Sequence, residues 1–336
     1  VEEKALFSER VSFSSPPTSI ERFGEGLQEF FCQESEISKV QKEISARFIP
    51  IPAGIQIDED KQRIYLPKIG TVGYRKSRSI IGKPKNITVS RQGQKWFVSI
   101  QTEFEIESKR MINSEIGIDM GVKKFVTFSN RTFVEPVNSL KNNLKQLAKL
   151  QKELSRQQKG RNNSKKTKAK ITKLHRRIAN IRRDFLHKIT TTIAKNHGIV
   201  FMEDLKVSNM SASASGTVEQ PGKKVRQKSG LNRSILDQGW FSFKTMLAYK
   251  LEERGGLLVL VPPKNTSRTC PNCRYISAEN RRTQAHFSCI KCGYKENADV
   301  VGAINVLRAG HVRLACEMNG AVRLLSAGTQ RDLLQQ

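Results

Sequence analysis

The sequence lacks any long hydrophobic run. Its longest strongly apolar stretch, residues 256–261, is far shorter than the roughly 20 residues that a membrane-spanning helix needs. The N-terminal region also lacks the combination of basic residues, an apolar run and a small-residue cleavage site that marks a secretion signal. These absences argue against a membrane protein and a secreted protein, so we expect a cytoplasmic location and no membrane partner.

Acidic residues are scarce relative to basic ones. The 336 residues include 59 lysines and arginines but 31 aspartates and glutamates, a formal net charge of +28 at pH 7. The hydrophobic share of 37% is ordinary for a globular protein, and the length is typical of two or three domains. A positive surplus of this size needs anionic partners, and the phosphate backbone of nucleic acid is the usual one.

The positive charge is unevenly distributed. Residues 1–45 contain five basic residues and nine glutamates, so this segment is net negative and the rest of the chain carries the surplus. Its pattern is weak, with a Ser/Pro loop predicted at 12–17 and a helix at 20–31. We interpret it as a separate, atypical acidic segment that contributes little to RNA binding.

Residues 46–110 have the pattern of a small β-rich domain. Short β-branched and aromatic runs predict strands at 55–58, 63–66, 87–90 and 96–100. Strands at this spacing favour a small barrel or sandwich, and we expect a β-barrel-like domain. A purely stabilising role for this domain stays open.

Strands and helices alternate in the next part of the chain. The expected elements are strands at 115–119, 124–128 and 131–134, a helical hairpin at 138–197, a strand at 198–202, a polar loop at 208–232, a helix at 242–253 and a strand at 257–261. A last helix is expected at 298–308, and the tail after Gly310 has no readable pattern.

The hairpin carries a strong excess of positive charge. Residues 141–197 contain 18 lysines and arginines against Glu153 and Asp184. A charge run is often only a solvated helix face, and that alternative stays open. Like charges at i,i+4 repel, so a face of one sign is better explained by a polyanion against it. The candidate nucleic-acid contacts are Lys165, Lys166, Lys168, Lys170, Arg176, Arg177, Arg182 and Arg183.

Four of the six cysteines have metal-ligand spacing. Two C-x2-C pairs, Cys270 with Cys273 and Cys289 with Cys292, are separated by fifteen residues. This spacing predicts a closed site of four thiolates for one structural Zn2+. A pair of disulfides or four unrelated thiols are the alternatives, and the absence of a secretion signal disfavours disulfides.

Three acidic residues stand at the ends of apolar elements. Asp119 follows a predicted apolar strand, Glu203 ends another, and Asp299 begins the last predicted helix. Each one alone is more often a helix cap or a strand-end surface residue. Their order along strands and helices matches the RNase H-like fold, in which such acids converge to hold two Mg2+ ions. The neighbour Asp204 is expected on the opposite face of its strand from Glu203.

Several of these motifs together resemble the TnpB family, the transposon-encoded RNA-guided DNA endonucleases related to type V CRISPR effector nucleases. The resemblance covers roughly residues 46–320. It rests on the two C-x2-C pairs and on the motifs Gly117-Ile-Asp-Met-Gly121, Met202-Glu-Asp-Leu205, Leu231–Trp240, Lys264–Cys270 and Asn297-Ala-Asp299.

The resemblance implies an α/β protein with an RNase H-like (RuvC) nuclease domain and an inserted zinc ribbon, preceded by the small β-barrel-like domain. It implies that Asp119, Glu203 and Asp299 are catalytic ligands of two Mg2+ ions. The partners implied are a guide RNA, gripped by the β-rich domain, and target DNA, with the hairpin along their duplex. A prokaryotic, nucleoid-associated location follows from the same resemblance.

Three departures from the family pattern are present. Val301 replaces the usual Asn two residues after the last Asp, although Asn305 is kept, and Arg274 replaces the usual Gly after the first cysteine pair. A basic recognition lobe does not precede residue 46, and the chain begins with Val1, so we expect an atypical or truncated N-terminus.

The predicted domain organisation therefore has six parts. These are an acidic segment at 1–45, a wedge-like β-rich domain at 46–110, a nuclease domain at 111–265 with the basic hairpin at 138–197, a zinc ribbon at 266–296, a last nuclease segment at 297–312 and a tail at 313–336.

The leading functional hypothesis is an RNA-guided DNA endonuclease of a transposable element that hydrolyses phosphodiester bonds with two metal ions. The alternative is a truncated relative that binds nucleic acid without cutting it. An unguided junction nuclease would share the acids but would explain neither the ribbon nor the basic hairpin. The oligomeric state is left open by the sequence.

Overall fold

The computed structural model describes residues 5–12, 48–51, 56–67, 69–92, 95–105 and 112–332. The predicted N-terminal helix at 20–31 and most of the loop before it lie outside these residues. No helix in the described part of the chain is long and apolar enough to cross a membrane.

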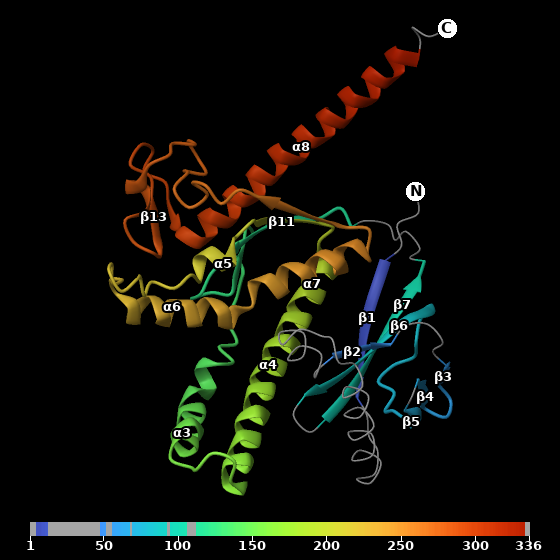
Figure 1. Cartoon of the computed structure of the whole chain (residues 1–336). Coiled ribbons are helices and arrows are strands. Elements are labelled where there is room, and N and C mark those ends of the chain that lie inside the picture. Colours follow the sequence, from blue (N-terminus) through green and yellow to red (C-terminus); the bar gives the residue numbers. More distant parts are fainter. Residues whose placement is uncertain are drawn as a thin grey trace. The chain divides into compact units, whose positions relative to one another are not determined.

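The chain forms two compact units, coloured along the sequence in Figure 1. One consists of residues 1–107 with 160–176, and the other of residues 108–159 with 177–336.

The first unit contains two antiparallel sheets. The larger has the strand order β1-β7-β6-β2, and the smaller has the order β3-β4-β5. Their bounds are β1 Ala5–Ser12, β2 Phe48–Ile51, β3 Gln56–Asp58, β4 Arg63–Leu66, β5 Gly70–Gly73, β6 Lys83–Gln92 and β7 Lys95–Phe104.

Alternating side chains on these strands form a shared core. Ile87 and Val89 on β6 and Val98 and Ile100 on β7 are fully or almost fully buried, as the period of two in a strand requires. Ile64 of the smaller sheet belongs to the same cluster. No strand pairing joins the two sheets within the described residues, so the expected barrel closure is not confirmed.

The first strand lies inside the acidic segment, where no strand was predicted. Strand β1 pairs antiparallel with β7 along its whole length, from Ala5 opposite Phe104 to Ser12 opposite Phe97. Backbone pairing with β7 places this strand in the sheet. Such pairing is hard to predict from a short sequence of mixed polar and apolar residues. Removing residues 1–45 would therefore remove an edge strand as well as negative charge.

The second unit is built on a mixed five-stranded sheet of order β10-β9-β8-β11-β12. Strands β9 and β10 are added antiparallel on one side of β8, and β11 and β12 are added parallel on the other. The bounds are β8 Glu115–Met120, β9 Val126–Phe128, β10 Phe133–Val134, β11 Ile199–Glu203 and β12 Leu257–Val261.

Helices cover both faces of this sheet. On one face, Ile118 and Met202 pack with Leu186 of α4 (Asn162–Asn196) and Phe243 of α7 (Trp240–Glu252). On the other face, Phe201 packs with residues of α8 (Ala298–Asp332). Figure 1 shows α7 and α8 on opposite sides of β11.

Glycines let α8 approach the sheet closely. A Cβ on Gly117 of β8 would lie 2.3 Å from the carbonyl oxygen of Ala303, and one on Gly310 would lie 1.8 Å from the ring of Phe201. The last helix was predicted to span 298–308, with no readable pattern after Gly310. That expectation is wrong: the glycine serves a close contact with Phe201, and α8 continues to Asp332.

The predicted polar loop at 208–232 is also partly wrong. Helix α5 (Val207–Met210) and helix α6 (Val225–Gln238) lie in or across it. Helix α6 buries few side chains, chiefly Ile235, Asp237 and Gln238 near its end, so its mostly polar sequence lacks the apolar period that predicts a helix.

Both predicted arms of the hairpin are helical. They are α3 (Leu144–Ser155) and α4, joined by a short turn in which Gly160 has a φ of +84°. This left-handed conformation is accessible to glycine at low cost, so the break predicted at 159–163 has a local cause.

Replacing Gly117 with Ala should destabilise the second unit. The new methyl would meet the backbone of α8, which cannot yield as a flexible side chain would, so we expect a loss of about 1–3 kcal/mol. Gly230 of α6 is the matched control, because a Cβ there meets nothing within 4 Å. Gly230→Ala should be neutral or stabilise the helix by about 0.5–1 kcal/mol. Equal melting temperatures for the two variants would contradict the proposed close packing.

Candidate functional site

Two carboxylates lie on the sheet face that α8 covers. Ile118 and Met202 face the opposite core, so their neighbours Asp119 on β8 and Glu203 on β11 turn toward α8. The parallel register pairs Met202 with Ile118, and one step further along both strands reaches Glu203 and Asp119. The two acids therefore lie on adjacent strands.

The third acid reaches this face from the start of α8. Asn297 caps the helix, because its side-chain oxygen accepts from the backbone N–H of Asp299 at 2.9 Å and of Val300 at 3.3 Å. Asp299 thus stands in the first turn, where the helix dipole favours negative charge. A Cβ on Gly302, one turn later, would lie 3.1 Å from the Asp119 carboxylate, so α8 passes directly over Asp119.

The three acids repel one another electrostatically. Burial raises the pKa of Asp119 well above its ordinary value, and the charges of Glu203 and Asp299 raise it further. Burial also raises the pKa of Glu203. The structure therefore brings the three predicted acids into one interacting group whose negative charge calls for a cation.

A threonine and an asparagine orient Glu203. The hydroxyl of Thr266 donates to Glu203 Oε1 at 2.5 Å, and this bond opposes the effect of burial on the Glu203 pKa. Asn305 of α8 donates to the carbonyl oxygens of Thr266 and Thr269, at 2.7 Å each. The roles of these residues were not predicted, although both lie in or near motifs that carry the family resemblance.

Arg281 supplies the nearby positive charge. It comes from the short helix η2 (Ala278–Arg281), and its guanidinium lies 3.4 Å from Asp299 Oδ1. Its charge lowers the pKa of both Asp119 and Glu203, against the effect of burial. Sequence reasoning missed Arg281, because no motif or spacing singled it out.

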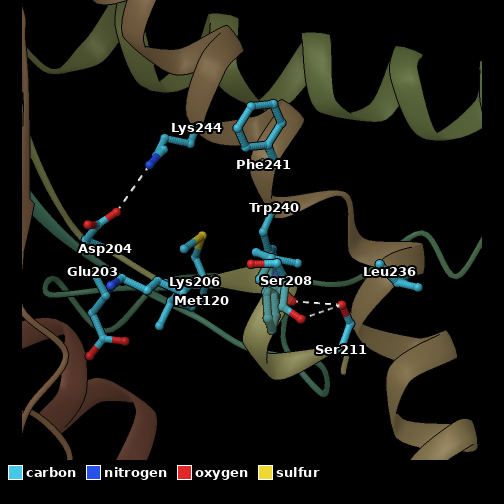
Figure 2. A pocket seen from close by; sticks show the side chains of 12 residues that line it. Met120, Glu203, Asp204, Lys206, Ser208, Ser211, Leu236, Trp240, Phe241 and Lys244 are labelled. Carbon is cyan, nitrogen blue, oxygen red and sulfur yellow. Dashed lines mark hydrogen bonds and ion pairs between the residues drawn. The ribbon is translucent and has the colours of Figure 1, made fainter. Parts of the chain in front are cut away.

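Asp204 lies apart from this group, as expected. Its side chain is exposed and forms an ion pair with Lys244 of α7, with the Lys244 Nζ 3.2 Å from Asp204 Oδ1. In Figure 2 the carboxylates of Asp204 and Glu203 point in different directions.

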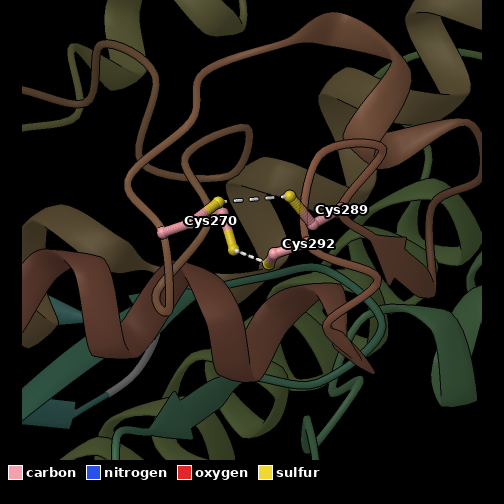
Figure 3. Close-up of side chains that lie close together, drawn as sticks. Cys270, Cys289 and Cys292 are labelled. Carbon is pink, nitrogen blue, oxygen red and sulfur yellow. Dashed lines mark hydrogen bonds between the residues drawn. The ribbon is translucent and has the colours of Figure 1, made fainter.

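The four predicted cysteine ligands come together. The Sγ atoms of Cys270 and Cys292 are 3.6 Å apart, those of Cys273 and Cys289 are 3.5 Å apart, and all four lie within 4.8 Å of one another. Figure 3 shows the labelled side chains of Cys270, Cys289 and Cys292 turned toward a common point. A disulfide requires about 2.05 Å, whereas four thiolates at ~2.3 Å from one tetrahedral ion lie about 3.8 Å apart. The geometry fits a metal ion and not disulfides.

Within the described residues, the four cysteines are the only group of cysteine, histidine or acidic side chains whose ligand atoms lie close enough together to hold one metal ion. The three carboxylates interact electrostatically without meeting that close spacing. Their oxygens are nevertheless the hard ligands that Mg2+ prefers.

Both cysteine pairs use the same turn. The amide of Cys270 donates to the Tyr275 carbonyl, and the amide of Cys289 donates to the Tyr294 carbonyl. Each turn has a left-handed residue after its second cysteine, Gly293 at φ +73° and Arg274 at φ +60°. A backbone hydrogen bond from Tyr294 is the main cause that lowers the pKa of Cys292, to about 6, whereas burial raises the pKa of Cys270, so Cys292 is the more easily ionised of these two thiols.

Val301 links the ribbon to α8. It is fully buried in a small cluster with Phe287 and with Cys270 and Cys289. The apolar residue at this position therefore has a packing role, and the ribbon core is continuous with the helix that carries Asp299.

The predicted nucleic-acid contacts all lie on α4, and most are exposed. The side chains at the surface are Lys165, Lys166, Lys168, Lys170, Arg177 and Arg183, whereas Arg176 and Arg182 are partly buried. Arg182 forms an ion pair with the buried Asp237, at 3.7 Å, and donates to the Leu236 carbonyl. This engagement gives Arg182 a structural role in addition to any contact with nucleic acid.

Two protein-family models match the chain. The model OrfB_IS605, described as "Probable transposase", matches residues 97–214. The model "Cas12f1-like, TNB domain" matches residues 240–306, which include the cysteine cluster and Asp299.

Named relatives cover most of the chain. A protein of Escherichia coli K12 named "Putative RNA-guided DNA endonuclease InsQ" is 49% identical over 299 residues, which are 89% of this chain and 74% of that protein. A "Putative RNA-guided DNA endonuclease" of Streptomyces pristinaespiralis is 32% identical over 76% of this chain and 60% of its own length. The Cas12f1 endodeoxyribonuclease of Sulfoacidibacillus thermotolerans is 27% identical, and the match spans 50% of its length.

Solved structures with similar chains include a Cas12f1–sgRNA–target DNA complex. It has a TM-score of 0.47 and 19% identity, over 77% of this chain and 58% of that one.

Replacing Asp119 with Asn should stabilise the protein in buffer without divalent cations. The folded-state pKa of Asp119 is raised, so above its ordinary value of 3.8 the folded state binds more protons than the unfolded state, and stability falls as the pH rises. Asp119→Asn removes this penalty, so its melting temperature should exceed that of the wild type at pH 7 and match it near pH 3.

The exposed Asp204, changed to Asn, is the control and should show no such gain at pH 7. A pH-independent difference between Asp119→Asn and the wild type would contradict the electrostatic account.

Proposed function

The chain belongs to the TnpB family, and from this membership we propose that it is an RNA-guided DNA endonuclease encoded by a transposable element. The names of the relatives from Escherichia coli and Streptomyces pristinaespiralis support this activity. Within the chain, the observation that carries the proposal is the grouping of two acids of the sheet, Asp119 and Glu203, with Asp299 in the first turn of α8. Three mutually repelling carboxylates, of which Glu203 is buried and the other two are partly buried, are costly to a fold unless they serve a cationic site.

The second unit is proposed to be an RNase H-like nuclease domain of the RuvC type. Its sheet order supports this, because the central β8 has antiparallel neighbours on one side and parallel neighbours on the other. Asp119 then belongs to the first strand of the domain, Glu203 to the fourth, and Asp299 to the last helix.

The three acids are proposed to be the catalytic residues and to hold two Mg2+ ions. The chemistry supplied by bound Mg2+ is the activation of a water and the stabilisation of the leaving 3′-oxygen. Thr266 keeps Glu203 in one orientation through its hydroxyl, so this carboxylate does not have to reorganise for each cut. Arg281 offsets part of the negative charge near Asp299, which reduces the repulsion of an approaching phosphate.

The four cysteines are proposed to hold one structural Zn2+. Their site is closed, with four protein ligands and no open position, and it organises a ribbon that has a small core of its own. Because the ribbon core includes Ala298 and Val301, the ion would also fix the start of α8 and hence Asp299.

The basic face of α4 is proposed to contact the guide RNA and its duplex with target DNA. Its exposed lysines and arginines can bind phosphates without reading sequence, which suits a protein that leaves sequence choice to base pairing. The β-rich first unit is proposed to grip the guide RNA.

Loss of any of the three acids should abolish cleavage while nucleic-acid binding persists. Asp119→Ala, Glu203→Gln and Asp299→Ala should each lower the cleavage rate at least ~1000-fold, because metal ligation fails, whereas affinity comes from phosphate contacts elsewhere. The measurement is cleavage of double- and single-stranded target DNA by the purified chain with its guide RNA and Mg2+, beside a binding assay.

Asp204→Asn is the matched control for this experiment and should cut at the wild-type rate. Cleavage by the triple variant would refute the assignment of the catalytic acids. Binding without cleavage by the wild type would instead favour a non-cleaving relative.

One Zn2+ per chain should co-purify, and Cys270→Ser or Cys292→Ser should lower both the zinc content and the yield of soluble protein. Elemental analysis of folded protein measures this directly, and a metal-free folded sample would contradict the proposal.

Arg274→Gly tests the zinc ribbon with a substitution that should stabilise the metal site. It relieves a left-handed conformation that costs an L-residue about 1 kcal/mol, so zinc should be released more slowly to a chelator. Arg282, with an ordinary φ of −74°, is the control, and Arg282→Gly should not slow the release.

Charge reversal on α4 should weaken binding regardless of sequence. Changing Lys165, Lys166, Lys168 and Lys170 to Glu removes cationic contacts, so affinity should fall at low salt and its salt dependence should flatten. An unchanged affinity at 50 mM salt would mean that this face is only solvated.

A further inference from the structure

A cavity of about 530 Å3 has Glu203 among its lining residues. It is bounded by the loop after β11 and by the facing ends of α6 and α7, as Figure 2 shows from close by. Its lining residues on these helices are Leu236, Trp240, Phe241 and Lys244, and those on the strand and loop include Met120, Glu203, Asp204 and Lys206.

The cavity occupies a favourable place in the sheet. It lies at the carboxyl ends of the parallel neighbours β8 and β11, where the chain leaves β8 toward β9 on one side and leaves β11 toward β12 on the other. Ligands of α/β sheets bind at such switch points. Of the three acids, Glu203 at the carboxyl end of β11 lines this cavity.

Phe241 is unusually exposed at the rim of this cavity. Trp240 and Phe241 are successive residues of α7 and so point about 100° apart: Trp240 is 3% exposed in the core, whereas Phe241 is 70% exposed. No ring of the described residues stacks on Phe241. A single exposed Phe is ordinary on a protein surface, but this one stands beside Leu236, itself 53% exposed, on a cavity that Glu203 also lines.

Positive charge accompanies the ring. Lys206 lies exposed on the loop after β11, and no ion-pair partner is found for it among the described residues. Lys244 lies on α7, one helical turn after Phe241, and is held by Asp204. Because Asp204 balances the charge of Lys244, Lys206 is the cation left to meet a phosphate. An exposed aromatic ring near a cationic side chain is typical of sites that bind single-stranded nucleic acid, because bases stack on the ring while phosphates meet the cation.

We propose that Phe241 is a positioning residue that stacks on a base of the DNA strand being cut, with Lys206 at a phosphate of that strand. The inference rests on the proposed nuclease function and deepens it. The ring and Glu203 line one cavity, so a base held against Phe241 keeps the backbone of that strand next to the end of β11, where Glu203 stands. The occupant is a single strand because stacking needs an unpaired base with a free face.

Photo-crosslinking tests the contact itself. The wild-type complex with guide RNA, and the same complex of the non-cleaving Asp119→Asn variant, receive target DNA with 5-iododeoxyuridine near the cut site. Long-wavelength irradiation should link the DNA to Phe241, as located by mass spectrometry, and Phe241→Leu should abolish the link. Links only at other residues, or only when iodouridine stands in the guide RNA, would overturn the proposal.

Cleavage kinetics test the consequence. Phe241→Ala should slow single-turnover cleavage about 5- to 100-fold, the range expected for one lost base–aromatic stack, with target binding unchanged. Phe241→Trp should restore the rate, and Phe241→Leu should not, because only the former keeps a ring. Leu231, an exposed residue of α6 that does not line the cavity, is the control, and Leu231→Ala should cut normally.

The outcomes separate this inference from the function on which it rests. Wild-type cleavage with an unaffected Phe241→Ala variant would overturn the role of Phe241 and leave the nuclease intact. A crosslink at Phe241 in a wild type that does not cut would support the stacking contact while refuting the endonuclease activity. An equal loss of cleavage rate in Phe241→Ala and Phe241→Trp would show that both substitutions disturb the structure, and it would overturn the stacking role.

Discussion

The close approach of α8 to β8 is the constraint on which the rest of the site depends. Gly117 removes the side chain that would hold the helix away from the strand, and Gly302 does the same over Asp119. Because α8 packs so close to β8, its first turn places Asp299 near the two carboxylates of the sheet. The ribbon core is continuous with the same helix through Val301, so the cysteine site and the acidic site share one rigid support.

Burial and mutual repulsion of the acids destabilise the fold at this site, although the surrounding residues are well packed. Asp119 is flanked by apolar neighbours on β8 and faces two further acids, and its raised pKa expresses the resulting penalty. The Thr266 hydroxyl lowers the pKa of Glu203, and the Arg281 guanidinium lowers the pKa of both Asp119 and Glu203, so these two groups relieve part of the penalty. Such a compromise between stability and function is expected when preorganised charge is needed to hold a cation.

The features that local sequence encodes were predictable. The short apolar runs before Asp119 and Glu203 placed these acids at the ends of strands, and the C-x2-C spacing anticipated the four converging thiols. Features that depend on tertiary contact were not predictable. The continuation of α8 past residue 308 was missed, because the contact of Gly310 with Phe201 cannot be detected in the sequence, and Arg281 lies in a short helix that no motif marks. Strand β1 was missed because its pairing partner, β7, lies some ninety residues away.

The central claim is that Asp119, Glu203 and Asp299 form one divalent-cation site beneath α8. Anomalous diffraction from crystals soaked in Mn2+, which takes the same oxygen ligands as Mg2+, tests this claim most directly. The account predicts anomalous peaks in contact with all three carboxylates and their loss in crystals of the Asp119→Asn variant. Mn2+ bound elsewhere, or bound at these acids with undiminished occupancy in the variant, would contradict it.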